Sequence, residues 1–349
     1  MRVLLIKTSS LGDVVHTLPA LTDALRAIPS IRFDWVVEEG FAEIPCWHPA
    51  VDQVIPVAIR RWRKHPLQTW RSGEWHDFKK RIHQQKYDLV IDAQGLLKSA
   101  WLTRGFKVPV VGFNRQSARE PIASYFYDRP IFVPREQHAV ERVRQLFAQA
   151  LRYALPKQIG EYSLHRERLA IAEQHAPYVL FLHGTTWPSK HWPQTAWRAL
   201  AEQLSEQGIA VRIPWGSAEE EQRAHFIAEG LPQVTVLPRL NITGVAGQIA
   251  GAQACVAVDT GLGHLAAALD VPCVSLYGPT LPGRVGAYGQ GQVHLCAPGP
   301  NAGLGDRNLP CFDQLGAEQV LAALRPLLTP TAQAQQSDTQ QVVHDKDAG

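Results

Sequence analysis

Val256-Ala-Val-Asp-Thr-Gly-Leu-Gly-His264 has the pattern of a strand, a polar turn with two glycines and the start of a helix. The apolar run from Cys255 to Val258 is typical of a strand buried on both faces. Gly261 and Gly263 let a ligand approach the backbone, and the first N–H groups of the helix favour an anion. The stretch therefore predicts either a phosphate site or an ordinary βα turn with its helix cap.

The composition indicates a soluble protein with two domains of ordinary size. The chain has 349 residues, of which 45% are hydrophobic and 19% charged. No signal peptide precedes the first strand, and no apolar stretch reaches the roughly 18 residues of a membrane helix. The net charge is only +3, so attraction to polyanions requires local clustering.

The cysteines and histidines do not indicate a metal site. Five cysteines are scattered without paired metal spacing, which predicts reduced thiols in a cytosolic protein. The fourteen histidines likewise show no close zinc-ligand grouping. We therefore predict neither a metal nor another cofactor.

Strands and helices alternate along the first half of the chain. A strand at Arg2–Lys7 is followed by a polar loop and by a helix expected from Val14 to Ile28, which Pro29 ends. This alternation predicts an α/β fold with a parallel, doubly wound sheet. Further strands are expected at 33–37, 51–57, 87–92 and 108–112, and helices at 94–104 and 136–150.

A second α/β series begins with the strand expected at 178–183, after the pattern weakens between 153 and 177. We therefore predict domains at 1–160 and 161–328, and a polar, Gln-rich disordered tail at 329–349. The second series has expected strands at 210–214, 234–237, 255–258 and 273–276, and helices at 194–207, 218–230, 242–250 and 316–328.

A basic segment lies between residues 60 and 86. It has nine Lys or Arg residues against two acids, with Trp62, Trp70 and Trp75 interleaved. A solvated charged face is one interpretation. The density of charge and the tryptophans favour the other, a surface for an anionic ligand with an apolar part.

Two facing doubly wound domains would bring their strand-end loops together in one cleft, because ligands bind outside the carboxyl ends of the strands. Asp13 is either a helix-capping acid or a general base. Lys190 is either a solvated loop residue or a cation for a leaving phosphate. The other candidates are Ser10, Thr185, Thr186, Glu220, Asp259, Thr260, Gly261 and His264.

Several other classes of protein are disfavoured. Gly261 to Ala266 formally fits a dinucleotide motif, but no acid occurs between 271 and 305, which argues against a dehydrogenase. The chain lacks a P-loop motif and a serine-hydrolase elbow. A nucleic-acid binder would use the basic segment and leave the glycine turn unexplained; its binding would weaken steeply with salt.

The combined motifs resemble those of the bacterial lipopolysaccharide heptosyltransferases, glycosyltransferase family 9. The resemblance lies in the opening MRVLLIKTSSLGD with Val14 to Ala20 and continues to about Leu328. It is strongest to the type I branch. Further matching stretches are 35–40, 60–64, 92–96, 190–193 and 259–264.

That resemblance implies GT-B architecture, with the acceptor on the N-terminal domain and the nucleotide sugar on the C-terminal one. The implied reaction moves L-glycero-D-manno-heptose from ADP-heptose to Kdo of Kdo-lipid A with inversion; the alternative is a relative that adds a later core heptose. Asp13 would be the base. The donor would be bound by Thr185, Thr186, Lys190, Glu220, Asp259, Thr260, Gly261 and His264, and the acceptor by Ser10, Arg60, Arg61, Arg63 and Lys64.

The resemblance also implies the partners and the location. The protein would act without a metal, as a monomer, on the cytoplasmic face of the inner membrane, held to its anionic surface by the basic segment. Two positions depart from the family pattern: Gly263, where serine is more usual, and the Pro-containing loop from Thr186 to Lys190.

Overall fold

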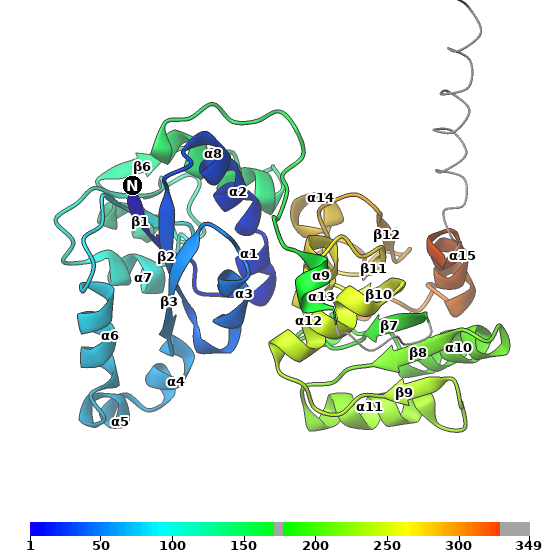
Figure 1. Ribbon diagram of the computed structural model, residues 1–349. Helices are drawn as coiled ribbons and strands as arrows, with labels where there is room; N and C mark the ends of the chain where they lie inside the picture. Colours follow the sequence, from blue (N-terminus) through cyan, green and yellow to red (C-terminus); the bar gives the residue numbers. More distant parts are fainter. Residues whose placement is uncertain (171–176, 329–349) are drawn as a thin grey trace, which may run out of the picture.

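The computed structural model describes residues 1–170 and 177–328. It contains two six-stranded sheets, and every strand pairing in both is parallel. Figure 1 shows the two sheets in separate halves of the molecule, each with its own helices. The predicted α/β fold with two doubly wound domains is confirmed. The boundary near residue 160 stays a prediction, and the tail at 329–349 lies outside the described residues.

The N-terminal sheet has the order β3-β2-β1-β4-β5-β6. The chain therefore reverses direction across the sheet between β1 and β4, which is where doubly wound sheets bind ligands. The strands are β1 Arg2–Ile6, β2 Arg32–Glu38, β3 Val51–Val57, β4 Leu89–Asp92, β5 Val110–Phe113 and β6 Arg129–Ile131. The helices are α1 Leu11–Val15, α2 Leu18–Ala27, η1 Glu39–Phe41, α3 Glu43–Cys46, α4 Ile59–Lys64, α5 Pro66–Arg71, α6 Glu74–Ile82, α7 Leu97–Ala100, η2 Trp101–Thr103, η3 Pro121–Phe126 and α8 Ala139–Leu151.

The C-terminal sheet repeats this topology with the order β12-β11-β10-β7-β8-β9. Its reversal lies between β7 and β10. The strands are β7 Tyr178–Leu182, β8 Ala210–Ile213, β9 Val234–Val236, β10 Ala254–Val258, β11 Cys273–Tyr277 and β12 Gln292–Cys296. The helices are α9 Arg166–Leu169, η4 Pro188–Lys190, α10 Gln194–Glu206, α11 Ala218–Ala228, α12 Ile242–Gly251, α13 Gly261–Ala268, α14 Pro282–Val285 and α15 Ala317–Leu328.

Two helices expected from the sequence are broken in the structure. The helix expected from Val14 to Ile28 is divided into α1 and α2, because Pro19 has no N–H to continue the first helix and stands in the first turn of the second. The helix expected over 94–104 begins only at Leu97. The Asp92 carboxylate accepts the backbone N–H groups of Gln94 and Gly95, and Gly95 has φ +67°, so this loop cannot be helical.

The two domains are joined by apolar and polar contacts. One buried apolar cluster extends from β1 in the N-terminal domain to Leu265 in α13. At its edge, His138 Nε2 lies 3.1 Å from the Gly286 carbonyl, and the Tyr288 hydroxyl accepts the Gly160 N–H at 2.8 Å. These contacts bring the carboxyl ends of β1 and β10 close together.

Candidate active site

Asp13 lies in the first turn of α1, directly after β1. Its Oδ2 accepts the Ser10 N–H at 2.9 Å, and its Oδ1 lies 3.5 Å from the Lys7 ammonium. Burial acts to raise the pKa of Asp13, but Lys7, the Ser10 N–H and Arg119 outweigh it and lower the pKa from the ordinary aspartate value. Asp13 therefore caps its helix and also stays ionised at neutral pH in a half-buried position.

The loop before α1 is held by residues that follow β4. Gln94 Oε1 accepts the N–H groups of Thr8 and Ser9 at 3.0 and 3.1 Å. Lys7 donates to the Ala93 carbonyl at 3.0 Å. The adjacent strands β1 and β4 thus fix the position of Asp13 from both sides of the topological reversal.

Lys98 is a functional candidate that the sequence argument did not single out. Its ammonium donates to Ser9 Oγ at 3.1 Å, which places it beside the loop that carries Ser10 and Asp13. Burial lowers its pKa, and Arg60 and Arg63 add to that effect, so the basic segment lies near this lysine. The only indication in the sequence was that Lys98 lies just after the stretch 92–96, which matches the family pattern.

Lys190 is bound to Asp259 at the carboxyl edge of the C-terminal sheet. Its ammonium lies 2.6 Å from Asp259 Oδ2, and its side chain is 14% exposed, which excludes a freely solvated lysine. Thr280 donates to the same carboxylate oxygen at 2.6 Å, and Thr185 donates to the Asp259 carbonyl at 3.1 Å. The loops after β7, β10 and β11 therefore meet at Asp259.

The N-terminus of α13 lies beside Asp259 at this edge. Thr260 precedes the helix and Gly261 begins it. His264, one turn further on, is buried with its Nε2 4.0 Å from Asp259 Oδ1. Burial lowers the pKa of His264 to about 4 against the opposing effect of Asp259, so its ring is neutral without a ligand.

Glu220 and Thr186 lie at the outer part of this edge. Glu220, in the first turn of α11, accepts the Gly216 N–H at 2.8 Å through Oε2. Gly184 follows β7, and a Cβ there would overlap the Glu220 carboxylate, so the carboxylate lies directly against the backbone of this loop. Thr186 is exposed.

The helices α1 and α13 are in direct contact across the domain interface. A Cβ on Gly12 would overlap the His264 ring, and a Cβ on Gly261 would overlap Leu11. His16, at the end of α1, has its Nε2 3.2 Å from His264 Nδ1. The structure therefore brings together Asp13 and the helix predicted to bind the diphosphate. The contact through His16 was not predicted from the sequence.

The basic segment differs in part from the expectation. Arg61 is bound to both Glu39 and Glu74, at 3.1 and 2.9 Å. Trp62 and Trp75 pack on each other and on Phe78 with ring centroids 5.7 Å apart, so these two of the three tryptophans stabilise the fold. Of the four basic residues predicted to bind the acceptor, Arg60, Arg63 and Lys64 are exposed and have no ion pair within the described residues.

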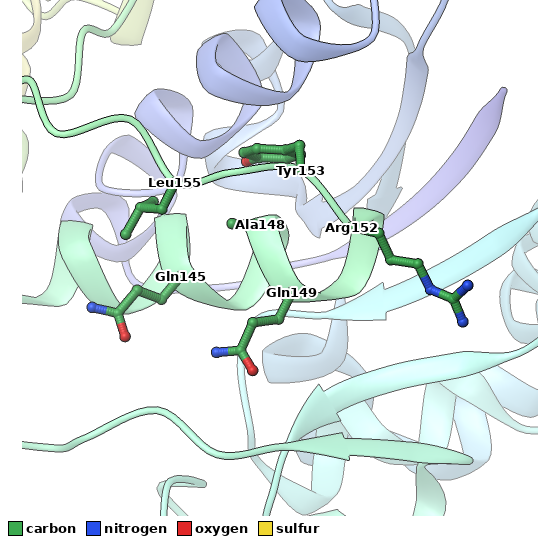
Figure 2. Close-up of a pocket in the computed structure, with 6 residues that line it drawn as sticks. All are labelled: Gln145, Ala148, Gln149, Arg152, Tyr153 and Leu155. Atoms are coloured by element: carbon green, nitrogen blue, oxygen red, sulfur yellow. The ribbon is translucent and has the colours of Figure 1, made fainter.

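A surface hollow of about 430 Å³ lies elsewhere, at the end of α8. Figure 2 shows Gln145 and Gln149 pointing away from the Tyr153 ring, so its polar side chains do not converge on one point. None of the predicted site residues lines it. The candidate site is therefore the junction of α1 and α13.

The described residues show neither a cluster of metal ligands nor a helix that could span a membrane. Within residues 1–170 and 177–328, no three His, Cys, Asp or Glu side chains gather as metal ligands would. No helix in the described part of the chain is long and apolar enough to cross a membrane.

The sequence matches the family model described as glycosyltransferase family 9 (heptosyltransferase) over residues 75–308. The chain belongs to glycosyltransferase family 9. It is 67% identical to lipopolysaccharide heptosyltransferase 1 of Pseudomonas aeruginosa over 304 residues, which cover 85% of this chain and 86% of that protein. It is 52% identical to the Escherichia coli K12 protein of the same name, over 86% of this chain and 95% of that one.

The solved structures agree with this family 9 assignment. Escherichia coli heptosyltransferase WaaC with ADP superposes with a TM-score of 0.86 at 48% identity, over 94% of this chain and all of that one. Escherichia coli heptosyltransferase II, at 21% identity and a TM-score of 0.74, shares the fold. The chain is a glycosyltransferase, and its sequence groups with the type 1 heptosyltransferases of lipopolysaccharide biosynthesis; a type 2 relative from Salmonella typhimurium is 29% identical.

Proposed function

We propose that the chain transfers L-glycero-D-manno-heptose from ADP-heptose to the Kdo residue of Kdo-lipid A, in a single inverting displacement. The observation that carries the proposal is the contact between α1, which bears Asp13, and α13, which bears His264. A base and an anion-binding helix N-terminus then face one substrate position. WaaC has been solved with ADP and with ADP-2-deoxy-2-fluoro heptose, which supports the donor.

The donor would lie on the carboxyl edge of the C-terminal sheet. The N–H groups at the start of α13 and the Lys190 ammonium would bind the diphosphate. Asp259, which already holds Lys190 at 2.6 Å, would accept heptose hydroxyls with its remaining oxygen. Thr185, Thr186, Thr260, Gly261 and His264 would complete the phosphate contacts, and Glu220 the contact to the adenosine ribose.

In the reaction, a Kdo hydroxyl attacks the anomeric carbon of heptose as Asp13 takes its proton. The new bond forms as the bond from that carbon to the phosphate oxygen breaks, and ADP leaves with the electron pair. Lys190 and the helix N-terminus stabilise the charge that develops on ADP. General-base catalysis of this kind contributes about 10²–10⁴ in rate.

The acceptor would lie on the N-terminal domain. Ser10, Arg60, Arg63 and Lys64 remain the proposed ligands of its carboxylates and phosphates. We add Lys98, because its ammonium reaches Ser9 beside Asp13. Arg61 binds Glu39 and Glu74 and would act mainly by holding α4 in place. The protein would work as a monomer bound peripherally to the cytoplasmic face of the inner membrane, without a metal.

The test is transfer by the purified protein, with ADP-heptose, deacylated Kdo-lipid A and EDTA, followed as ADP release. Release that requires the acceptor supports both the reaction and its independence of metal. Release only with an already heptosylated core would indicate the later-step alternative. Binding of ADP without release on either acceptor would contradict the proposed reaction.

A further inference from the structure

An exposed apolar patch lies next to the proposed acceptor side. Leu97, Trp101, Ile122 and Tyr125 are large side chains that are 40, 49, 53 and 74% exposed, respectively. We call these four residues the Trp101 patch. They come from α7, η2 and η3, which form one surface: α7 contacts η3, the Leu97 N–H is accepted by Glu120, and Trp101 lies 6.3 Å from Phe126 between ring centroids.

A second exposed apolar surface lies on α5. Leu67 and Trp70 are 74 and 79% exposed and are three residues apart, so they lie on one side of the helix. Figure 1 places α5, α6 and α7 on the part of the N-terminal domain that faces away from the C-terminal domain. The C-terminal domain therefore does not cover either surface.

Basic side chains accompany both apolar surfaces. The Arg104 guanidinium lies over the Trp101 ring at 4.6 Å. Arg63 and Lys64 end α4, one residue before α5 begins, and Arg71 ends α5; all three are exposed. Exposed Trp and Tyr beside Arg and Lys is the composition of protein surfaces that lie at the headgroup level of a bilayer.

The orientation of α7 links this surface to the acceptor site. Lys98 lies between Leu97 and Trp101 in sequence, yet its ammonium reaches inward to Ser9, whereas both neighbours are exposed. This short helical turn thus has an apolar side exposed to solvent and a cation that reaches the loop between β1 and α1. A bilayer against the patch would therefore lie on the outer side of the helical turn whose lysine reaches the loop before Asp13.

We propose that the Trp101 patch, together with Leu67 and Trp70, binds the surface of an anionic phospholipid bilayer and directs the acceptor site toward it. The proposal rests on the proposed function only in that the acceptor is lipid-linked. Apolar patches of this kind mark interaction sites, and the surrounding arginines and lysines complement anionic headgroups.

The test is cosedimentation of the full chain with vesicles of phosphatidylethanolamine and phosphatidylglycerol, without donor or acceptor. The double variant Trp101→Gln/Tyr125→Gln should reduce the vesicle partition coefficient at least tenfold. The control variant Leu281→Gln/Leu304→Gln, which changes side chains 53 and 64% exposed in the C-terminal domain, should leave it unchanged. Equal partitioning of the Trp101/Tyr125 variant and wild type would overturn the proposal.

Three parallel measurements separate the alternatives. Circular dichroism melting checks that the Trp101/Tyr125 variant is folded; if it is not, the single variant Tyr125→Gln must show a reduced partition coefficient. If the wild type is a dimer, and the double variant is a monomer that still binds vesicles, the patch binds a second copy of the chain. That result would overturn the proposal. If the double variant binds vesicles fully but no longer transfers heptose to micellar acceptor, the patch binds the acyl chains of the acceptor. That result would also overturn the proposal. Wild-type vesicle binding that depends on the patch, without transfer to deacylated acceptor, would sustain this inference while contradicting the proposed function.

Discussion

His16, which ends the helix that carries Asp13, contacts His264 in the opposite domain, with Nε2 3.2 Å from His264 Nδ1. Both rings are buried, and the missing side chain of Gly12 leaves the space for the His264 ring. Because Nδ1 of His264 faces His16, the other ring nitrogen, Nε2, faces Asp259. A residue of the N-terminal domain therefore orients a residue of the proposed donor site.

We expect His16→Ala to raise the KM for ADP-heptose more than it lowers kcat, with a loss of about tenfold in kcat/KM. The reason is that His264 Nδ1 would be left buried without its hydrogen-bond partner, which costs about 1–3 kcal/mol. Steady-state kinetics check this, with the exposed His225→Ala as control. His16→Gln, which can still bind Nδ1, should recover part of the loss. Unchanged kinetics in His16→Ala would exclude the positioning role.

The main features of this site follow from the sequence because they depend on local patterns. Apolar runs followed by polar turns identified β1, β7 and β10. Because ligands bind at the carboxyl ends of parallel strands, the residues Asp13, Lys190 and Asp259 could be predicted to line one cleft. The division of the first helix could also have been read from Pro19.

The remaining features depend on partners that lie far away in the chain. Nothing near Lys98 or Gln94 shows that they hold the loop after β1, 85 or more residues earlier. The charge density of residues 60–86 did not reveal that Arg61 is bound by Glu39, or that Trp62 and Trp75 pack together. Such pairings require the tertiary structure.

Asp13→Asn should abolish transfer while preserving donor binding. The amide has nearly the shape of the carboxylate and can still accept the Ser10 N–H, but it cannot take a proton. We expect kcat to fall by about 10²–10⁴. Calorimetric titration with ADP should give a Kd within a factor of two of wild type. Turnover near the wild-type rate would contradict the assignment of Asp13 as base.

Lys190→Met should weaken donor use. The variant removes the cation proposed to bind the diphosphate and leaves the buried Asp259 carboxylate with Thr280 at 2.6 Å and the His264 ring at 4.0 Å. Loss of one charge-stabilising group of this kind costs about 10²–10³ in kcat. We expect a fall of that order in kcat/KM for ADP-heptose, and weaker ADP binding by calorimetry. The exposed Lys107→Met serves as control. If kcat/KM falls no more in Lys190→Met than in that control, Lys190 has a structural role and does not bind the donor.

Lys98→Gln should affect the acceptor and spare the donor. Its ammonium lies at Ser9, on the N-terminal side of the junction, whereas the proposed donor residues lie on the C-terminal side. We expect the KM for deacylated Kdo-lipid A to rise about tenfold, the value of one charge-assisted hydrogen bond of about 1.5 kcal/mol. The KM for ADP-heptose should not change. Equal effects on both constants would indicate a general disturbance of the loop and not an acceptor contact.

The free energy of unfolding should fall as the pH is lowered from 6.5 toward 4. Burial lowers the pKa of His48, His183 and His264 to about 4, so these rings are neutral in the folded state and charged in the unfolded state across that range. The unfolded chain then binds more protons, which destabilises the fold by about 1–2 kcal/mol per histidine at pH 5. Burial raises the pKa of Asp92 and Asp270, which opposes the trend. Burial also lowers the pKa of His16, His138 and His191, which adds to it.

Thermal denaturation at pH 7.5 and pH 5, at constant ionic strength, measures this dependence. His48→Gln should flatten it, because the amide can replace the contacts of His48 to Ala50 and Thr22 without titrating. The exposed His225→Gln should leave the pH dependence as in wild type. Equal melting temperatures of the wild type at the two pH values would show that the buried histidines do not govern acid stability.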